Sequence, residues 1–283
     1  LPSNDHAVFT LSKNRTKLEE HYKIITSSPE VIQNIYDKSK LLKVANETNV
    51  PIPKTFYFSS VDEILSQNLP FPVITKGCNG LSFYKSMDRK AFLSYNKKEL
   101  TEHLNIVTKK IPVSSTFTQE VIPSDGNNKT ISFTAFCIEG IIKTYWIGEK
   151  LREHPWQFGT ATFCISKYYP ELVEPSSRIL RYLNYTGICE IEYLKDPRKS
   201  TYLLIEINAR TWLWVGLAKE CGIDYAKIIY SYANQKSLVY PDHYTIDLKW
   251  INRLTDTLVV SRALLSRKLT LSEYFKSLKG KKV

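Results

Sequence analysis

The stretch "IEYLKDPRKSTYLLIEINAR", residues 191–210, contains two apolar runs on either side of a charged turn, which predicts a β-hairpin. Residues two apart on a strand point to the same face, so Glu206, Asn208 and Arg210 share one face of the second strand. If the strands pair antiparallel across the turn, Glu192 lies opposite this row. We therefore expect three oxygen-bearing side chains to converge on one point, next to a guanidinium.

This predicted cluster has the chemistry of a metal site. Carboxylates buried together are costly unless a cation compensates their charge. Mg²⁺ is often held by one or two carboxylates, with substrate phosphates completing its octahedron. Glu192, Glu206 and Asn208 are therefore candidate metal ligands, and Arg210 is a candidate to contact phosphoryl oxygens or developing charge. The same pattern also fits solvated charges on an exposed hairpin, and the local sequence does not separate the two interpretations.

The rest of the sequence predicts an α+β protein. In residues 37–110 helix and strand patterns alternate, with Asp37 and Asn96 as helix N-caps and residues 79–90 as a loop. Residues 115–166 form a run of β-branched and aromatic segments, with a hairpin turn at 139–140. Helix patterns dominate afterwards, apart from the hairpin, and end in two amphipathic helices broken near Lys268, which we expect to form a separate appendage. This order favours two α+β lobes over a doubly wound sheet.

Composition narrows the class of partner. A hydrophobic fraction of 43% and a charged fraction of 24% are ordinary for a globular protein. The net charge of +11 favours an anionic partner such as a nucleotide, a nucleic acid, a phosphorylated substrate or a membrane surface. Because the lysines are spread along the chain, a dedicated nucleic-acid surface is not expected.

The cysteines suggest a cytoplasmic protein. The five cysteines form no CxxC pair and are odd in number, which favours reduced thiols over a disulfide framework. No run of 18 apolar residues is present, so no membrane span is expected. The chain begins with Leu1 and ends in a basic tail, and we expect it to be part of a longer protein.

Further candidate residues lie outside the hairpin. Lys76 ends an otherwise apolar strand, where a lysine needs an anion nearby. Lys150, Arg152 and His154 alternate, so on an extended chain they would share one face and bind a substrate carboxylate or the transferring phosphate, with His154 as a candidate general base. A basic edge strand protected against aggregation is the alternative.

The two tryptophans that follow the hairpin have two interpretations as well. Trp212 and Trp214 could line a substrate pocket, but aromatic residues at such spacing more often fill a core, which is the interpretation we favour.

Taken with upstream residues, the hairpin resembles the ATP-grasp superfamily of ATP-dependent ligases. "EINAR" is similar to its metal-binding strand, which implies that Glu206 and Asn208, with Glu192 of the preceding strand, bind Mg²⁺, and that Arg210 is catalytic. Within the superfamily the chain looks most like the D-aspartate ligase and carbamoyl-phosphate-synthase-like carboligase group. That narrower likeness rests on "GEKLREHPWQFGT", "DRKAF" and "LTLSEYFKSLKGKK".

The resemblance also implies an ATP site. "DK" before a helix and "FPVITKG" are similar to the segments that bring phosphate-binding lysines, here Lys38 and Lys76. "TQEVIP" is similar to the strand that holds adenine. The adenine and ribose positions that it implies are Glu120, Val121, Ile122 and, for the ribose hydroxyls, Asp125. The lid segment departs from the family's glycine-rich loop, so Lys85, Arg89 or Lys90 would supply charge there instead.

The resemblance implies a domain order and an activity. It divides the chain into the end of an N-terminal α/β domain (1–36), a lid-side subdomain (37–122), a metal-binding catalytic subdomain (123–240) and a C-terminal helical segment (241–283). ATP would lie between the two subdomains, with Mg²⁺ or Mn²⁺. The expected activity is a ligase that activates a small-molecule carboxylate, such as an amino acid, as an acyl phosphate for attack by an amine, with Lys150 and Arg152 assisting Arg210.

Two alternatives stay open on the sequence. One is carbamoyl-phosphate-synthase-like phosphorylation of a small carboxylate, and the other is a catalytically degenerate ATP-binding module. The oligomeric state stays open too, a homodimer included.

Overall fold

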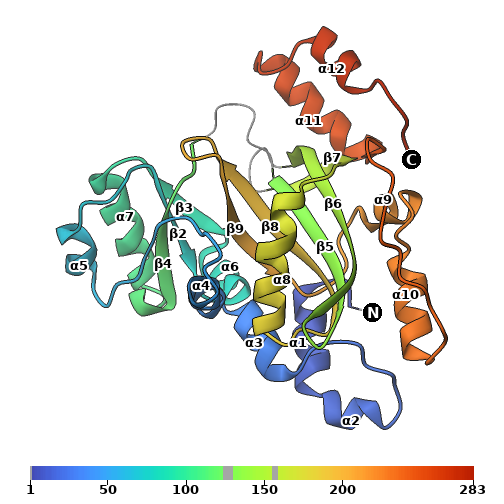
Figure 1. The fold of residues 1–283 in the computed structure, drawn as a ribbon. Helices are drawn as coiled ribbons and strands as arrows, with labels where there is room; N and C mark the ends of the chain where they lie inside the picture. The colour runs from blue at the N-terminus through green and yellow to red at the C-terminus, as the bar shows by residue number, and fades with distance from the viewer. Residues whose placement is uncertain (1, 124–129, 155–158) are drawn as a thin grey trace.

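The computed structural model describes residues 2–123, 130–154 and 159–283. In this part of the chain the strands form two antiparallel sheets, one of four strands and one of six, each with its own helices (Figure 1). The order of elements agrees with the predicted α+β class, with alternation first and an antiparallel run afterwards.

The smaller sheet has the strand order β1-β4-β2-β3. Its strands are β1 (Thr55–Phe56), β2 (Val73–Gly77), β3 (Ala91–Ser94) and β4 (Thr116–Glu120), with helices α5 (Val61–Ser66), α6 (Gly80–Met87) and α7 (Lys97–Thr108) and a 3₁₀ turn at Val113–Ser115. Leu100 and Leu104 of α7 are buried against Val73, as the predicted amphipathic helix requires.

Helix α6 corrects the prediction that residues 79–90 form a loop. The Asn79 side chain caps the helix by accepting a hydrogen bond from the Ser82 backbone N–H at 2.9 Å. Phe83 and Met87, four residues apart, are buried together in the core beneath the sheet. An N-cap and a buried pair at helical spacing therefore explain why these residues form a helix.

The larger sheet has the strand order β10-β7-β6-β5-β8-β9. Its strands are β5 (Thr130–Ile138), β6 (Ile141–His154), β7 (Thr160–Ser166), β8 (Gly187–Asp196), β9 (Thr201–Asn208) and β10 (Lys249–Ile251). The predicted hairpin turn at Glu139–Gly140 is confirmed, with positive φ angles of 49° and 74° at its two residues.

Two layers of helices cover the two faces of this sheet. On one face, α8 (Val173–Tyr182) buries Ile179 and Leu180, and the cluster includes Cys189 and Ile191 of β8. On the other face, α9 (Val215–Glu220) and α10 (Tyr225–Ala233) pack with Ile188. The side chains at 190 and 192 therefore point away from α8, because strand residues alternate between faces.

The N-terminal helices lie beside β9. These helices are α1 (Asp5–Lys13), α2 (Arg15–Glu19), α3 (Pro29–Tyr36) and α4 (Lys38–Glu47), and α3 and α4 both contact β9. Asp37 caps α4 as predicted, accepting a hydrogen bond from the Ser39 N–H at 2.9 Å. Helix α4 therefore starts next to the hairpin, although it is more than 150 residues away in sequence.

The C-terminal segment is joined to the larger sheet. It consists of β10, which pairs with β7, and of helices α11 (Arg253–Leu265) and α12 (Leu271–Ser277). Figure 1 shows the two helices beyond β7 at the edge of the molecule. The prediction of two helices is confirmed, but the prediction of a separate appendage is wrong because β10 continues the sheet. None of the described helices is long and apolar enough to cross a membrane.

Candidate functional site

The hairpin of β8 and β9 brings the predicted polar side chains together. Glu192 lies directly opposite Glu206, and Glu190 lies opposite Asn208. The Asn208 Nδ2 atom is 3.2 Å from Glu190 Oε2 and 3.5 Å from Glu206 Oε1. The sequence-based expectation that oxygen-bearing side chains gather on one face of this hairpin is therefore confirmed.

Glu190 is a further member of this cluster that the sequence analysis missed. Its side chain is 3% exposed and accepts hydrogen bonds from Ser132 Oγ at 2.8 Å and from Asn208. Burial raises the pKa of Glu190. The spacing that placed Glu206 and Asn208 on one face also places Glu190 beside Glu192, so the same rule could have found it.

Two lysines approach the carboxylates from other elements. Lys38, the first residue of α4, donates a hydrogen bond from Nζ to Glu206 Oε2 at 2.9 Å. Lys150 of β6 donates from Nζ to Glu192 Oε1 at 2.8 Å. Each opposing carboxylate of the hairpin is thus paired with one cation.

A third lysine, Lys76, enters from β2 of the smaller sheet. It interacts electrostatically with both Lys38 and Glu206, and burial and Lys38 lower its pKa to about 8. Among the described residues no carboxylate lies within ion-pair distance of its ammonium group. A half-buried ammonium next to a like charge is placed to receive an anion.

The carboxylates of Glu192 and Glu206 have opposite pKa shifts. The ammonium of Lys38 lowers the pKa of Glu206 to about 2, so this group is ionised at neutral pH. Burial raises the pKa of Glu192 to about 7 in spite of Lys150, with the neighbouring glutamates adding to the rise. A cation bound at Glu192 would lower its pKa again, because it would favour the ionised carboxylate.

Arg210 follows β9 and has a fixed orientation. Its Nη2 donates to Asn208 Oδ1 at 3.1 Å, its Nε donates to Asp5 Oδ1 at 2.6 Å, and its Nη1 donates to the Thr211 carbonyl at 3.0 Å. The Pro2 carbonyl in turn accepts hydrogen bonds from the Thr211 N–H and hydroxyl. The N-terminal residues therefore hold the guanidinium beside the hairpin cluster.

The donor set fits a hard divalent cation. Glu192, Glu206 and Asn208 offer carboxylate and amide oxygens, the ligands that Mg²⁺ prefers. Within the described ranges, no three Asp, Glu, His or Cys side chains are already arranged around one point. Lys38 occupies one oxygen of Glu206 and Lys150 one oxygen of Glu192, so a bound cation would take the other oxygens of these carboxylates or displace the ammonium groups.

Arg152 does not join this cluster. The β6–β7 pairing shifts register at Lys150–Arg152, so that Lys150 pairs with Cys164 and Arg152 with Phe163. Cys164 and Phe163 are consecutive residues of β7, so their side chains face opposite sides of the sheet. The β-bulge therefore points Arg152 away from Lys150. Arg152 forms a bidentate ion pair with Asp256 of α11, at 2.7 Å for each contact.

The bulge contradicts the expectation that Lys150, Arg152 and His154 share one face. One extra residue in the strand changes the alternation of side chains. His154 remains at the end of β6 beside Thr160, and Glu153 lies opposite Ala161. Only Lys150 of the three is placed in the cluster.

The predicted adenine segment lies between the two sheets. Glu120 ends β4, and its carboxylate accepts hydrogen bonds from the Lys54 N–H and from Arg198 Nη1, both at 2.9 Å. The Val121 N–H donates to the Pro72 carbonyl, and Ile122 is buried. The Glu120 side chain is thus used in an ion pair. Asp125 lies outside the described residues.

Trp212 and Trp214 belong to the core, as the sequence analysis favoured. Both are buried, and the ring of Trp214 packs edge-on against Trp146 with centroids 5.2 Å apart. A Cβ atom at Gly148 would lie 2.4 Å from the Trp214 ring, so this position needs a glycine.

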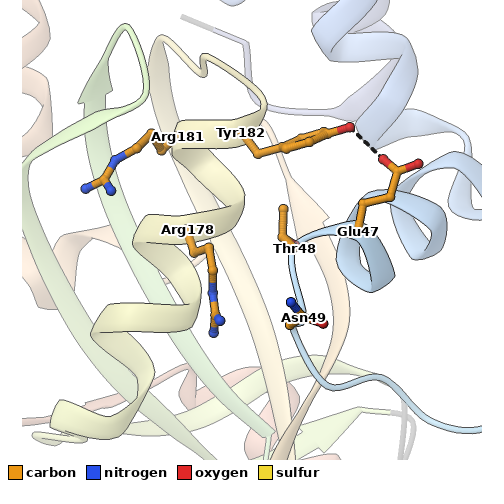
Figure 2. Close-up of a pocket in the computed structure, with 6 residues that line it drawn as sticks. All are labelled: Glu47, Thr48, Asn49, Arg178, Arg181 and Tyr182. Atoms are coloured by element: carbon orange, nitrogen blue, oxygen red, sulfur yellow. Dashed lines mark hydrogen bonds between the residues drawn. The ribbon is translucent and has the colours of Figure 1, made fainter.

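A separate pocket of about 330 Å³ lies between the C-terminal ends of α4 and α8. Figure 2 shows the Arg178 and Arg181 guanidinium groups pointing in different directions, while Tyr182 donates a hydrogen bond to Glu47. The predicted site residues do not line it. The pocket and the hairpin cluster lie on different sides of the larger sheet, because α8 covers the face opposite Glu190 and Glu192.

Comparison with known proteins relates the chain to several enzymes. The family model of the carbamoyl-phosphate synthase L chain ATP binding domain matches residues 150–239. D-aspartate ligase of Enterococcus faecium is 24% identical over 210 residues, which cover 71% of this chain and 50% of that protein. The arginine-specific large chain of carbamoyl phosphate synthase from Bacillus subtilis is 28% identical over 222 residues, covering 75% of this chain and 21% of that protein. The chain thus spans about half the length of the D-aspartate ligase, and less of the synthase.

Solved structures share the fold of the chain at low sequence identity. Biotin carboxylase from Campylobacter jejuni has a TM-score of 0.66 and 18% identity, covering 84% of this chain and 56% of that one. N5-carboxyaminoimidazole synthetase from Staphylococcus aureus has a TM-score of 0.65 and 15% identity, covering 86% and 66%. L-amino acid ligase from Bacillus licheniformis has a TM-score of 0.57 and 16% identity, covering 82% and 60%.

Proposed function

This chain has the ATP-grasp fold, as the resemblance of its sequence implied, and we propose that it is an ATP-dependent carboxylate–amine ligase. The observation that carries the proposal is the hairpin cluster, where Glu192, Glu206 and Asn208 meet Arg210 and three lysines. The similar proteins support a ligase activity, since two of them are named D-aspartate ligase and L-amino acid ligase. One similar structure, the biotin carboxylase domain of Hydrogenobacter thermophilus 2-oxoglutarate carboxylase, was solved with MgADP and bicarbonate.

In the proposed site ATP lies between residues 37–122 and 123–240, with its phosphates near the lysines. Glu192, Glu206 and Asn208 would hold Mg²⁺, with Mn²⁺ as the alternative ion, and the ion would neutralise phosphate charge. Lys38 and Lys150 now pair with carboxylates. Displaced from these carboxylates, the two ammonium groups could bind phosphate oxygens together with Lys76.

The reaction is proposed to take two steps. A carboxylate oxygen of the substrate attacks the γ-phosphorus, the bond to ADP breaks, and an acyl phosphate forms. An amine then attacks the acyl carbon, and phosphate leaves. Arg210 would donate hydrogen bonds to the phosphoryl oxygens as charge shifts toward ADP, and the contacts with Asp5 and Asn208 hold its guanidinium for this purpose.

Glu120, Val121 and Ile122 are proposed to line the adenine site because they connect the two sheets. We assign Arg152 no contact with the reacting groups, since it pairs with Asp256. The carboxylate and the amine are proposed to be small molecules, and a cytoplasmic location stays a prediction.

Phosphorylation of a small carboxylate without amide formation is the second candidate function, favoured by the 28% identity to a carbamoyl phosphate synthase.

Titration calorimetry with a non-hydrolysable ATP analogue tests the proposed site. We expect binding that requires Mg²⁺ and that weakens about tenfold or more in Glu206→Gln and Asn208→Ala, because each loses a ligand or its orientation. Glu174→Gln is the matched control, since this glutamate is exposed on α8, which covers the face of the larger sheet opposite the hairpin cluster. A wild-type protein that binds no nucleotide, or variants that bind like the control, would contradict the proposal. A second experiment tests the proposed reaction. Candidate carboxylates, beginning with D-aspartate, are screened for ADP formation that depends on the carboxylate.

Nucleotide affinity is expected to fall as pH rises above about 8. The pKa of Lys76 is lowered to about 8 without ligand, and a bound phosphate would raise it by favouring the ammonium form. The contribution of this group to binding is therefore complete below pH 8 and is lost as pH rises through the pKa of the complex, with a slope of at most about tenfold per pH unit.

Calorimetry at pH 7 and pH 9, in buffers with different ionisation enthalpies, measures this effect. Proton uptake on binding is expected near pH 8.5, and Lys76→Arg should remove it because arginine stays charged. If the wild type and Lys76→Arg show the same pH dependence, Lys76 is not the group that responds to the phosphates.

A further inference from the structure

Helix α11 presents a row of leucines to solvent. Leu254, Leu258 and Leu265 are 80%, 53% and 87% exposed. At about 100° per residue they lie within an arc of about 40° on the helix surface. The buried face of the helix, which includes Val259 and Ala263, lies on the opposite side. The row therefore belongs to neither core of the larger sheet.

Helix α12 also exposes large apolar side chains to solvent. Leu271 and Phe275 are four residues apart, so they are neighbours on the helix surface, and they are 61% and 63% exposed. Figure 1 shows α11 and α12 next to each other at the edge of the molecule. Large apolar side chains exposed on two neighbouring helices indicate an interaction surface.

The segment that carries these apolar side chains is strongly positive. Residues 253–283 contain eight basic and two acidic side chains, a net charge of +6 out of the +11 of the whole chain. All eight basic residues are exposed: Arg253, Arg262, Arg267, Lys268, Lys276, Lys279, Lys281 and Lys282. Of the two acids, Asp256 is buried against Arg152, and Glu273 is used in the capping box of α12. The charge facing solvent is thus almost wholly positive.

The two helices are fixed on the sheet. Arg152 binds Asp256 of α11 with two hydrogen bonds and donates a third to Ser277 Oγ of α12 at 2.9 Å. Lys249 of β10 donates from Nζ to the Ser277 carbonyl, and the tail pairs with the Lys249 backbone. The apolar row is therefore presented outward by a rigid support.

We propose that α11, α12 and the basic tail form a surface that docks on a lipid bilayer rich in anionic headgroups. Leucine and phenylalanine side chains would enter the boundary between headgroups and acyl chains, and the flanking lysines and arginines would contact the lipid phosphates. This combination is characteristic of helices that lie in the membrane interface. A nucleic acid would match the charge but leave the leucine row in water, and so the bilayer fits both features.

Co-sedimentation of the whole chain with vesicles tests this surface. Binding is expected to vesicles of phosphatidylcholine mixed with phosphatidylglycerol, and weakly or not at all to phosphatidylcholine alone. Raising the salt from about 0.1 M to about 1 M should weaken it strongly, because the Debye length shrinks from about 10 Å to about 3 Å. A triple change, Leu254→Ser with Leu258→Ser and Leu265→Ser, should weaken binding about tenfold or more.

Two further variants make the test specific. Ile106→Ser with Ile141→Ser is the matched control, since both isoleucines are exposed on other elements, and it should bind vesicles like the wild type. Arg262→Glu with Arg267→Glu should lose the preference for anionic vesicles. No vesicle binding by the wild type would overturn the proposal. Binding to DNA or heparin that exceeds vesicle binding, and that ignores the leucine changes, would also overturn it and assign the surface to a polyanion.

Discussion

Replacing Arg210 with lysine is expected to lower the rate of carboxylate-dependent ADP formation about 100-fold or more, with little change in ATP affinity. Lysine keeps the charge but loses the planar fork of donors. Asn208 and Asp5 orient the guanidinium, and in the proposed reaction it would stabilise charge that develops only during phosphoryl transfer. Losing one such donor commonly costs a factor of about 10² to 10³ in rate.

Steady-state kinetics with the carboxylate found by screening, together with calorimetry, separates the two effects. A catalytic role requires a fall in kcat with KM for ATP nearly unchanged. Arg181→Lys is the matched control, because this arginine is exposed on α8, which covers the face of the larger sheet opposite the hairpin cluster. Wild-type turnover in Arg210→Lys would instead give Arg210 the structural role of joining the N-terminal residues to β9.

Replacing Asp256 with alanine is expected to lower the free energy of unfolding by about 3–5 kcal/mol. Asp256 and Arg152 form a buried bidentate pair, and Thr162 donates a third hydrogen bond to the aspartate at 3.0 Å. Removing the aspartate leaves the guanidinium buried without its counter-charge, which is the costly way to break such a pair. Urea unfolding measures the change.

A double variant distinguishes the cost of an orphaned charge from general damage to packing. Arg152→Met with Asp256→Leu removes both charges, and it should recover most of the lost stability because buried ion pairs are often no better than apolar packing. Glu19→Ala, which breaks the exposed Arg15–Glu19 pair, should cost less than about 1 kcal/mol. A loss of that small size in Asp256→Ala would mean that the pair is not an anchor for α11.

Much of the fold and part of the candidate site could be predicted because they follow from local rules. Alternation along β9 placed Glu206 and Asn208 on one face, and the turn placed Glu192 opposite them. Helix capping by Asp37 and Asn96 was visible in the sequence for the same reason, since a cap involves residues two or three apart.

The wrong predictions have two causes: a bulge and a distant partner that patterns of neighbouring residues do not reveal, and a helical spacing that was overlooked. The bulge at Lys150–Arg152 changes the face of Arg152, and none of the three residues at the bulge is a glycine or proline that would signal it. The partner that explains Arg152, Asp256, is 104 residues away. Residues 79–90 were predicted as a loop because they are rich in polar and aromatic residues, and the helical spacing of Phe83 and Met87 was not given enough weight.

The contact between Lys38 and Glu206 has a consequence for how the chain folds. It joins residues 168 apart in sequence, and the contact between Asp5 and Arg210 joins residues 205 apart. Closing such long loops is slow, and the entropy must be lost before the contacts can compensate for it. We therefore expect the contacts of Lys38 and Asp5 with the hairpin to be among the last to form. A ligand that binds the hairpin cluster recognises only chains that have completed folding.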